Sequence, residues 1–259
     1  MKKNVLHTNN LTIGYKDKSK ILPVAKNINI ELKNGQLVSL IGANGIGKST
    51  LLKTLTGIIQ PLFGSVFINN EPLESLSNKQ LSQKRSVVLT DSLPPSNLTV
   101  YEIVALGRQP YTNWLGTLSQ LDKDKIEEAI TATEIKSFAH KKHYEISDGQ
   151  LQKALIARAL AQDTPLIILD EPTTHLDLVH KVTLLQLLQK LAHKTNKTIL
   201  YSTHDVDLAI QLCDEMIVCT ENKITQNSPC KLIEEGVFNT LFKNKNIEFD
   251  ASRGKFMIQ

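Results

Sequence analysis

The chain has 259 residues, of which 41% are hydrophobic and 22% are charged, a composition typical of a soluble globular protein with one large domain or two small ones. Its formal net charge is only +4, and the Lys and Arg residues are scattered, so no basic stripe argues for a nucleic-acid partner. Three cysteines without a C-x-x-C pair argue against a disulfide framework or a zinc site.

The first third of the chain alternates short extended segments with turns. We expect strands at 11–15, 27–32 and 37–42, and further extended segments at 64–70 and 85–89. The segment 37–42 runs directly into a loop and then a helix, which we expect to end at Gly57, shortly before Pro61.

The middle of the chain, from about Asp91 to Asp163, has helical periodicity instead. The segments 99–109, 122–139 and 144–162 each repeat apolar residues at helical spacing. We interpret this middle part as a helical insertion.

The last third returns to strand–helix alternation. A wholly apolar run at 165–170 is typical of a central strand in a parallel sheet. We expect strands at 198–203 and 215–220, helices at 181–195 and 205–213, and a terminal hairpin within 247–259. This alternation predicts an α/β protein with a parallel sheet covered by helices. No apolar run approaches the ~18 residues that span a bilayer, so we expect any membrane association to go through a partner.

A phosphate-binding loop is indicated between the strand 37–42 and the following helix. Gly42 to Thr50 read GANGIGKST, which fits G-x-x-x-x-G-K-[ST]. Glycines let backbone N–H groups face a polyphosphate, and the helix N-terminus adds positive potential. We therefore expect nucleotide binding through Gly42, Ala43, Asn44, Gly45, Gly47, Lys48, Ser49 and Thr50. Lys48 can reach the β- and γ-phosphates, and Ser49 can ligate Mg²⁺.

Two acidic residues and a histidine end the next two apolar strands. Asp170 ends the run at 165–170 and Glu171 follows it, and sheet topology puts such a strand end beside the phosphate loop. Asp170 is placed to hold Mg²⁺, and Glu171 to deprotonate an attacking water. His204 ends the strand at 198–203, where it can bond the γ-phosphate. The alternatives are a pair of helix-start acids ahead of Pro172 and an ordinary surface histidine.

A second anion-binding site is indicated at the start of the helix within 144–162. Ser147 to Gln150 read S-x-x-Q, a capping box, so this segment is at least a well-capped helix. Ser147 and the N–H of Gly149 at the positive helix end could also receive a phosphate. Because one chain already has a receptor in its phosphate loop, the second makes sense if it faces a nucleotide held by another copy.

Together these motifs resemble the ATP-binding subunit of an ABC transporter over about residues 3 to 240. GANGIGKST is similar to the Walker A motif, LIILDE to Walker B, ISDGQ to the signature motif, HLD ending at Asp177 to the D-loop and THD to the histidine switch. The resemblance implies that Tyr15 stacks on adenine and that the signature residues Ser147, Gly149 and Gln150 bind the ATP of a second copy.

The resemblance also implies the domain organisation. The whole chain, 1–259, forms one ABC ATPase domain of the P-loop NTPase class, a mostly parallel sheet core with an N-terminal antiparallel β subdomain and an inserted helical subdomain. The nucleotide-binding core takes 1–90 and 164–240, the helical subdomain with the signature takes 91–163, and 241–259 is a C-terminal extension.

Two positions depart from the family pattern. Asp148 stands where the signature usually has Gly, and because a carboxylate beside a triphosphate is costly, we expect it to cap its own helix. The Gln that usually follows the strand at 85–89 is absent. Asp91 is a candidate metal-facing substitute in that region, and Thr90 lies beside it.

The segment from Leu98 to Tyr111 contains GRQPY and resembles the subfamily that imports iron–siderophore complexes, haem or cobalamin. The implied function is ATP hydrolysis, with Mg²⁺, that powers import of a metal chelate. The implied partners are a second copy, membrane permease subunits and, indirectly, a solute-binding protein, with no nucleic acid, at the cytoplasmic face of the membrane. The alternatives are an ABC ATPase for another solute, a cytosolic ABC ATPase acting on ribosomes or DNA, and a small-molecule phosphotransferase.

Overall fold

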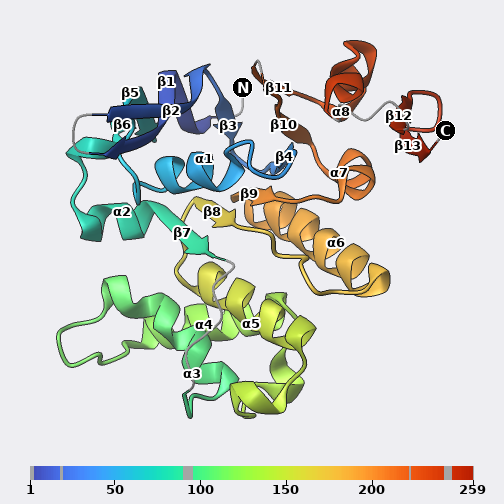
Figure 1. Ribbon diagram of the computed structural model, residues 1–259. Coiled ribbons are helices and arrows are strands. Elements are labelled where there is room, and N and C mark those ends of the chain that lie inside the picture. Colours follow the sequence, from blue (N-terminus) through green and yellow to red (C-terminus); the bar gives the residue numbers. More distant parts are fainter. Residues whose placement is uncertain (1–2, 18–19, 90–95, 222, 242–246, 259) are drawn as a thin grey trace.

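The computed structural model describes residues 3–17, 20–89, 96–221, 223–241 and 247–258. Two sheets stack in the upper part of the molecule, and a layer of helices lies below them (Figure 1). None of the described helices is both long enough and apolar enough to cross a membrane.

The N-terminal sheet is antiparallel and consists of short or irregular strands. Its strand order is β2-β1-β5-β6, and β3 pairs with β1. The strands are β1 (Asn4–Asp17), β2 (Lys20–Ile28), β3 (Glu31–Lys33), β5 (Phe63–Ile68) and β6 (Glu71–Pro72). The single strand predicted at 27–32 is wrong, because the chain leaves the sheet at residues 29–30, between the end of β2 and the start of β3.

The central sheet has the order β11-β10-β4-β9-β8-β7 and is parallel from β10 to β7. Its strands are β4 (Leu37–Gly42), β7 (Arg85–Val88), β8 (Leu166–Leu169), β9 (Thr198–Ser202), β10 (Glu215–Cys219) and β11 (Ile224–Asn227). Every residue of β4, β8 and β9 is buried. The α/β class with a mostly parallel sheet is therefore confirmed, and β11 adds an antiparallel edge.

Helices cover both faces of this sheet. The upper face packs on α1 (Lys48–Leu55) and the N-terminal sheet through one apolar cluster. The other face packs on α6 (Leu178–Thr195) and on the helical layer, α3 (Val100–Ala105), α4 (Gln120–Ala132) and α5 (Asp148–Ala161), through a second cluster. Shorter helical elements are α2 (Asn78–Lys84), α7 (Val206–Leu212), α8 (Pro229–Glu234) and the 3₁₀ turns η1 (Leu73–Ser75), η2 (Leu106–Tyr111), η3 (Lys136–Phe138), η4 (His143–Glu145) and η5 (Val237–Thr240).

The helical layer is one excursion of the chain between two neighbouring strands. The chain leaves the sheet after β7 and returns at β8, and these strands pair directly. The helix predicted over 122–139 is wrong beyond Ala132, since Glu134 has a φ of 59° and only η3 follows. Likewise the helix predicted over 99–109 changes to η2 at Leu106.

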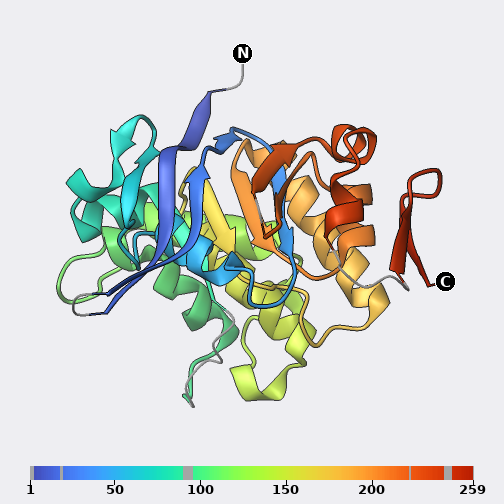
Figure 2. The same ribbon diagram turned by 45° about the horizontal axis from the view of Figure 1, so that its top comes forward.

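The C-terminal hairpin consists of β12 (Ile247–Asp250) and β13 (Lys255–Ile258), as predicted. It stands at one edge of the molecule (Figure 2). Phe249 anchors it, because this ring is buried and packs against Phe238 with ring centroids 4.8 Å apart.

Candidate functional site

The phosphate loop joins the end of β4 to the start of α1. Gly45 and Gly47 have φ values of 76° and 110°, a region that residues with a Cβ rarely occupy. No side chain caps α1 and its first turn holds no acidic residue, so its N–H groups keep their positive potential. The loop is therefore built to receive an anion.

Lys48 lies inside this loop. Its Nζ donates to the carbonyl oxygens of Gly42 at 2.8 Å and Ala43 at 3.2 Å. Burial lowers the pKa of Lys48, although Glu171, Cys219 and Asp170 oppose that shift. A buried ammonium that neighbouring carboxylates help to keep charged is suited to hold phosphate oxygens.

An apolar wall stands beside the phosphate loop. Tyr15 is half exposed on β1, and its hydroxyl lies 3.0 Å from Thr50 Oγ1. Val24 on β2 is partly exposed, and a Cβ on Gly47 would collide with it. Both side chains could contact a base or ribose. The sequence did not point to Val24, because β2 was not predicted and its strand pattern lacks alternation.

The predicted acids and histidine meet at the carboxyl ends of neighbouring strands. Glu171 Oε1 lies 2.6 Å from His204 Nε2, and Thr174 donates to Glu171 Oε2 at 3.1 Å. Glu171 has a φ of 48°, so its backbone is held in a conformation that costs free energy. Such strain at a site-lining residue is typical of a functional position.

Ser202, at the end of β9, fixes both acids and was missed from the sequence. Its Oγ donates to Asp170 Oδ1 at 2.6 Å and accepts from the Glu171 N–H at 2.8 Å. A buried strand serine ordinarily looks like packing, so only the pairing of β8 with β9 reveals its role.

The start of α5 has the predicted capping box. Ser147 Oγ accepts from the Gln150 N–H at 3.3 Å, and Gln150 Oε1 accepts from the Ser147 N–H at 3.0 Å. The expectation that Asp148 caps the helix is wrong, because Ser147 is the N-cap and Asp148 is exposed in the first turn. There the helix dipole favours its negative charge.

Nothing within one chain demands glycine at position 149. A Cβ there would lie 3.5 Å from Leu176 Cδ2, an ordinary contact, and the backbone φ is not positive. The start of α5 also lies apart from α1 in the ribbon view (Figure 1), so the two anion-receiving helix ends do not meet within the chain. Gly149 is partly exposed, so a group outside the chain can reach its backbone.

Metal-binding groups are few. Within the described residues no cluster of three or more His, Cys, Asp or Glu side chains could hold an ion alone. The Ser49 hydroxyl is exposed at the start of α1, and Asp170 contributes to the electrostatic field at Lys48. Two oxygen donors beside a phosphate site suit Mg²⁺, which takes one or two protein ligands together with substrate phosphates. Asp91 and Thr90 lie outside the described residues.

Comparisons with known proteins give a consistent picture. The family described as ABC transporter matches residues 25–174. An uncharacterized ABC transporter ATP-binding protein of Methanocaldococcus jannaschii is 38% identical, over 98% of this chain and 87% of the relative. A petrobactin import ATP-binding protein of Bacillus anthracis is 34% identical, over 92% of this chain and 86% of the relative.

Solved structures agree with these sequence matches. An ABC transporter of metal-chelate type, in an inward-facing conformation, superposes with a TM-score of 0.80 at 25% identity, over 98% of this chain and 96% of the other. A dimeric ATP-binding cassette bound to ADP and phosphate superposes with a TM-score of 0.72 at 31% identity, over 86% of this chain and 98% of the other.

Proposed function

The chain belongs to the ABC transporter family and is an ATPase, and from that premise we propose that it powers import of a metal chelate through a membrane permease. One observation carries the proposal. Lys48, Asp170, Glu171 and His204 converge at the carboxyl ends of β4, β8 and β9, which are neighbours in the sheet. A phosphate receptor next to a carboxylate–imidazole pair is suited to hydrolysis of a phosphoanhydride.

ATP binding in this proposal uses the phosphate loop. The N–H groups at the start of α1 and the ammonium of Lys48 hold the phosphates, and Tyr15 and Val24 flank the adenosine end. Ser49 and Asp170 would hold Mg²⁺, which when bound neutralises charge on the β- and γ-phosphates.

Hydrolysis in this proposal uses Glu171 as the general base. Thr174 and His204 each contact one of its carboxylate oxygens, so the carboxylate is oriented before a water arrives. His204 is partly exposed and is also the group we assign to the γ-phosphate.

A second copy completes each site in this proposal. Ser147, Gly149 and Gln150 begin a helix whose positive end lies apart from the chain's own phosphate loop (Figure 1). A γ-phosphate held by the partner would accept from these groups, so ATP would join the two copies and its hydrolysis would separate them. The partial exposure of Gly149, and the lack of any need for glycine there within one chain, support this arrangement.

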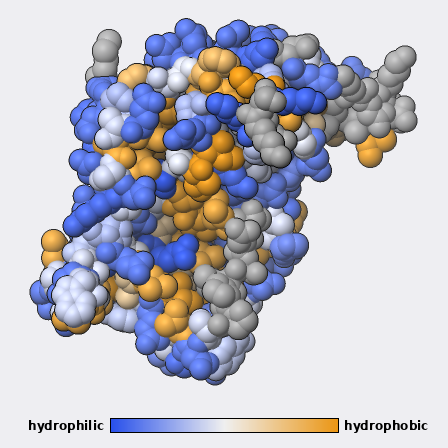
Figure 3. Space-filling view, turned by 60° about the vertical axis from the view of Figure 1, so that its left-hand side comes forward, coloured by the Kyte–Doolittle hydropathy of each residue, from blue (hydrophilic) through white to orange (hydrophobic). Residues whose placement is uncertain are grey.

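The permease is proposed to dock in a groove between the core and the helical layer. The groove has a volume of about 660 Å³ and is lined by α2, β7, η2 and the end of α5, including Ser82, Val87, Leu106 and Gln162. Apolar surface gathers in the middle of this face (Figure 3). Because the groove borders both the core and the helical layer, a permease helix docked in it would be displaced when these two parts move relative to each other. Docking there would hold the chain at the cytoplasmic face of the membrane.

The metal chelate is proposed from the relatives, since one is named for petrobactin import and one solved transporter is of metal-chelate type. The test is copurification of the chain with its permease, reconstitution, and measurement of ATPase stimulation by ferric siderophore, haem and cobalamin. Capture of ribosomes or DNA in place of a permease would support the cytosolic alternative instead. If only an unrelated solute stimulated the ATPase, the metal chelate would be wrong as the substrate class, and the role of the chain as a transporter ATPase would stand.

Replacement of the general base gives a direct test of the mechanism. Glu171→Gln keeps the size of the side chain and removes its basicity, so we expect turnover to fall by at least about 100-fold, within the range typical of a lost general base. We also expect an ATP-dependent dimer in sedimentation velocity. Wild-type turnover in this variant would refute the role of Glu171.

A further inference from the structure

An uncharged loop projects from the helical layer between η2 and α4. Residues 112–119 carry Trp114, which is 92% exposed, and Leu115, which is 67% exposed. Leu121 follows in the first turn of α4 and is 62% exposed. We call Trp114, Leu115 and Leu121 the Trp114 surface. Large apolar side chains gathered on one exposed segment often mark an interaction site.

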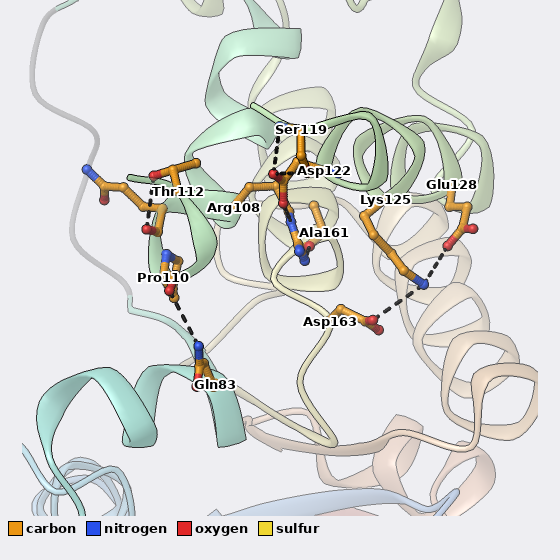
Figure 4. Close-up of polar contacts among 11 residues, drawn as sticks. Gln83, Arg108, Pro110, Thr112, Ser119, Asp122, Lys125, Glu128, Ala161 and Asp163 are labelled. Carbon is orange, nitrogen blue, oxygen red and sulfur yellow. Dashed lines mark hydrogen bonds and ion pairs between the residues drawn. The ribbon is translucent and has the colours of Figure 1, made fainter. Parts of the chain in front are cut away.

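The base of this loop is held by a buried ion pair. Arg108 Nε lies 2.8 Å from Asp122 Oδ1, and both side chains are almost fully buried. Arg108 also donates to the Ala161 carbonyl at 2.8 Å, and Ser119 donates to Asp122 Oδ2 at 2.6 Å (Figure 4). Arg108 stacks on Tyr111, with its Cζ 4.0 Å from the ring centroid. Both ends of the loop are therefore held in place by buried polar contacts.

The loop itself is also ordered by its own contacts. Asn113 Oδ1 accepts from the N–H groups of Leu115 and Thr117, each at 3.1 Å. Gly116 makes the turn with a φ of 70°. Since Trp114 is presented on an ordered loop, a partner that buries it has little chain entropy to overcome.

The ATP-joined dimer would not cover this surface. Arg108 bonds to Ala161 at the end of α5, whereas Ser147 caps the start of α5. A helix of 14 residues is about 21 Å long, so the loop stands at the opposite end of α5 from the proposed partner ATP.

The loop that carries the Trp114 surface starts at the proposed permease groove and has no charged side chain. Gln109, Pro110 and Thr112 line that groove, and Trp114 follows two residues later. No charged residue occurs between Arg108 and Asp122, and these two neutralise each other. An anionic lipid surface would be attracted by Lys or Arg, which this segment lacks. A neutral, apolar polypeptide is the matching occupant.

We propose that the Trp114 surface is a second anchor for the cytoplasmic polypeptide of the permease, outside the groove. This inference rests on the proposed function. The groove takes one helix of the permease, and the Trp114 surface packs against the apolar polypeptide next to it. Trp is the residue type most enriched among side chains that dominate binding energy at protein interfaces.

The single tryptophan of the chain provides the probe. Trp114 is replaced by 5-hydroxytryptophan, which is excited selectively in the presence of permease tryptophans. We expect acrylamide quenching of this label to fall several-fold when the subunit joins its permease in nanodiscs. Equal quenching in the free subunit and the complex would overturn the proposal. So would equal protection by vesicles of phosphatidylcholine and phosphatidylglycerol without permease, because the occupant would then be lipid.

Affinity measurements complete the test. The double variant Trp114→Ala, Leu115→Ala should weaken binding to the permease about 30-fold, the loss expected for an interface hot spot. ATPase activity of the isolated subunit should stay unchanged, because the loop lies far from the phosphate loop. The control Ile258→Ala removes an equally exposed side chain on the terminal hairpin and should leave the affinity unchanged. Equal affinity of the double variant and the control would refute the anchor.

A groove variant separates this inference from the proposed function. Ser82→Arg places a long cation in the groove. If it weakens the complex and the double variant does not, only the Trp114 anchor fails. If the wild-type chain forms no complex with any permease, the proposed function fails and the anchor with it.

Discussion

Removal of the Ser202 hydroxyl should damage both the stability and the catalytic centre of this ATPase. In the native protein this buried hydroxyl donates to the Asp170 carboxylate at 2.6 Å and accepts from the Glu171 N–H at 2.8 Å. Ser202→Ala leaves both groups without that partner. A hydrogen bond to a charged group contributes about 1.5–3 kcal/mol and a neutral one about 1 kcal/mol. We therefore expect the free energy of unfolding to fall by about 3 kcal/mol.

This loss can be measured by urea unfolding and by thermal unfolding, in which about 3 kcal/mol corresponds to a midpoint lower by roughly 8 °C for a chain of this size. ATP turnover should fall as well, because Glu171 loses the bond that holds its strained backbone. The matched control is Ser39→Ala on β4, which removes an equally buried hydroxyl whose neighbour is the Cys213 thiol, a weak hydrogen-bonding group, in place of a carboxylate. Equal stability and turnover of the two variants would refute this reasoning.

Two other substitutions test the helical layer. Burial disfavours the charged form of Asp122, but hydrogen bonds from Ser119 and Arg108 outweigh it and hold the pKa of Asp122 below its ordinary value. The carboxylate therefore stabilises the fold above about pH 4, and this contribution is lost as the pH falls through the lowered folded pKa. Asp122→Asn should lower the free energy of unfolding by about 3–5 kcal/mol at pH 7, because Arg108 is left buried without its counter-charge. Near pH 3 the loss should be clearly smaller. Urea unfolding at both pH values measures the loss, and an equal loss at both would contradict this reasoning. Gly149→Ala should leave the melting temperature within about 2 °C of wild type, because the new Cβ has room, yet it should impair the ATP-dependent dimer formed in the Glu171→Gln background. A dimer of unchanged affinity in sedimentation velocity would exclude close approach of a ligand at this glycine.

Much of the central fold was predictable because its signals are local. The apolar runs of β4, β8 and β9 are buried over their full length, as continuous hydrophobic strands of a parallel sheet should be. The capping box at Ser147 marked the start of α5 correctly. These elements carry their structural information within a few consecutive residues.

The remaining elements depend on contacts that no local pattern reveals. β2 is exposed along most of its length and contains Pro23, so it forms mainly because β1 pairs with it. The end of α4 was missed because Glu134, rather than glycine, adopts the left-handed conformation after it. In the site, Ser202 and Val24 were missed for the same reason, since each acts across a strand pair or against a loop distant in sequence.

The position of β4 also bears on how the protein is made. Both strands that flank it, β9 and β10, come from the last third of the chain. During synthesis this strand, which is fully buried in the finished fold, therefore leaves the ribosome long before either neighbour exists, with two unsatisfied edges that are open to aggregation. The nucleotide site grows directly from β4, so nascent chains that stop before Thr198 should be unable to bind ATP and should depend on chaperones until translation is almost finished.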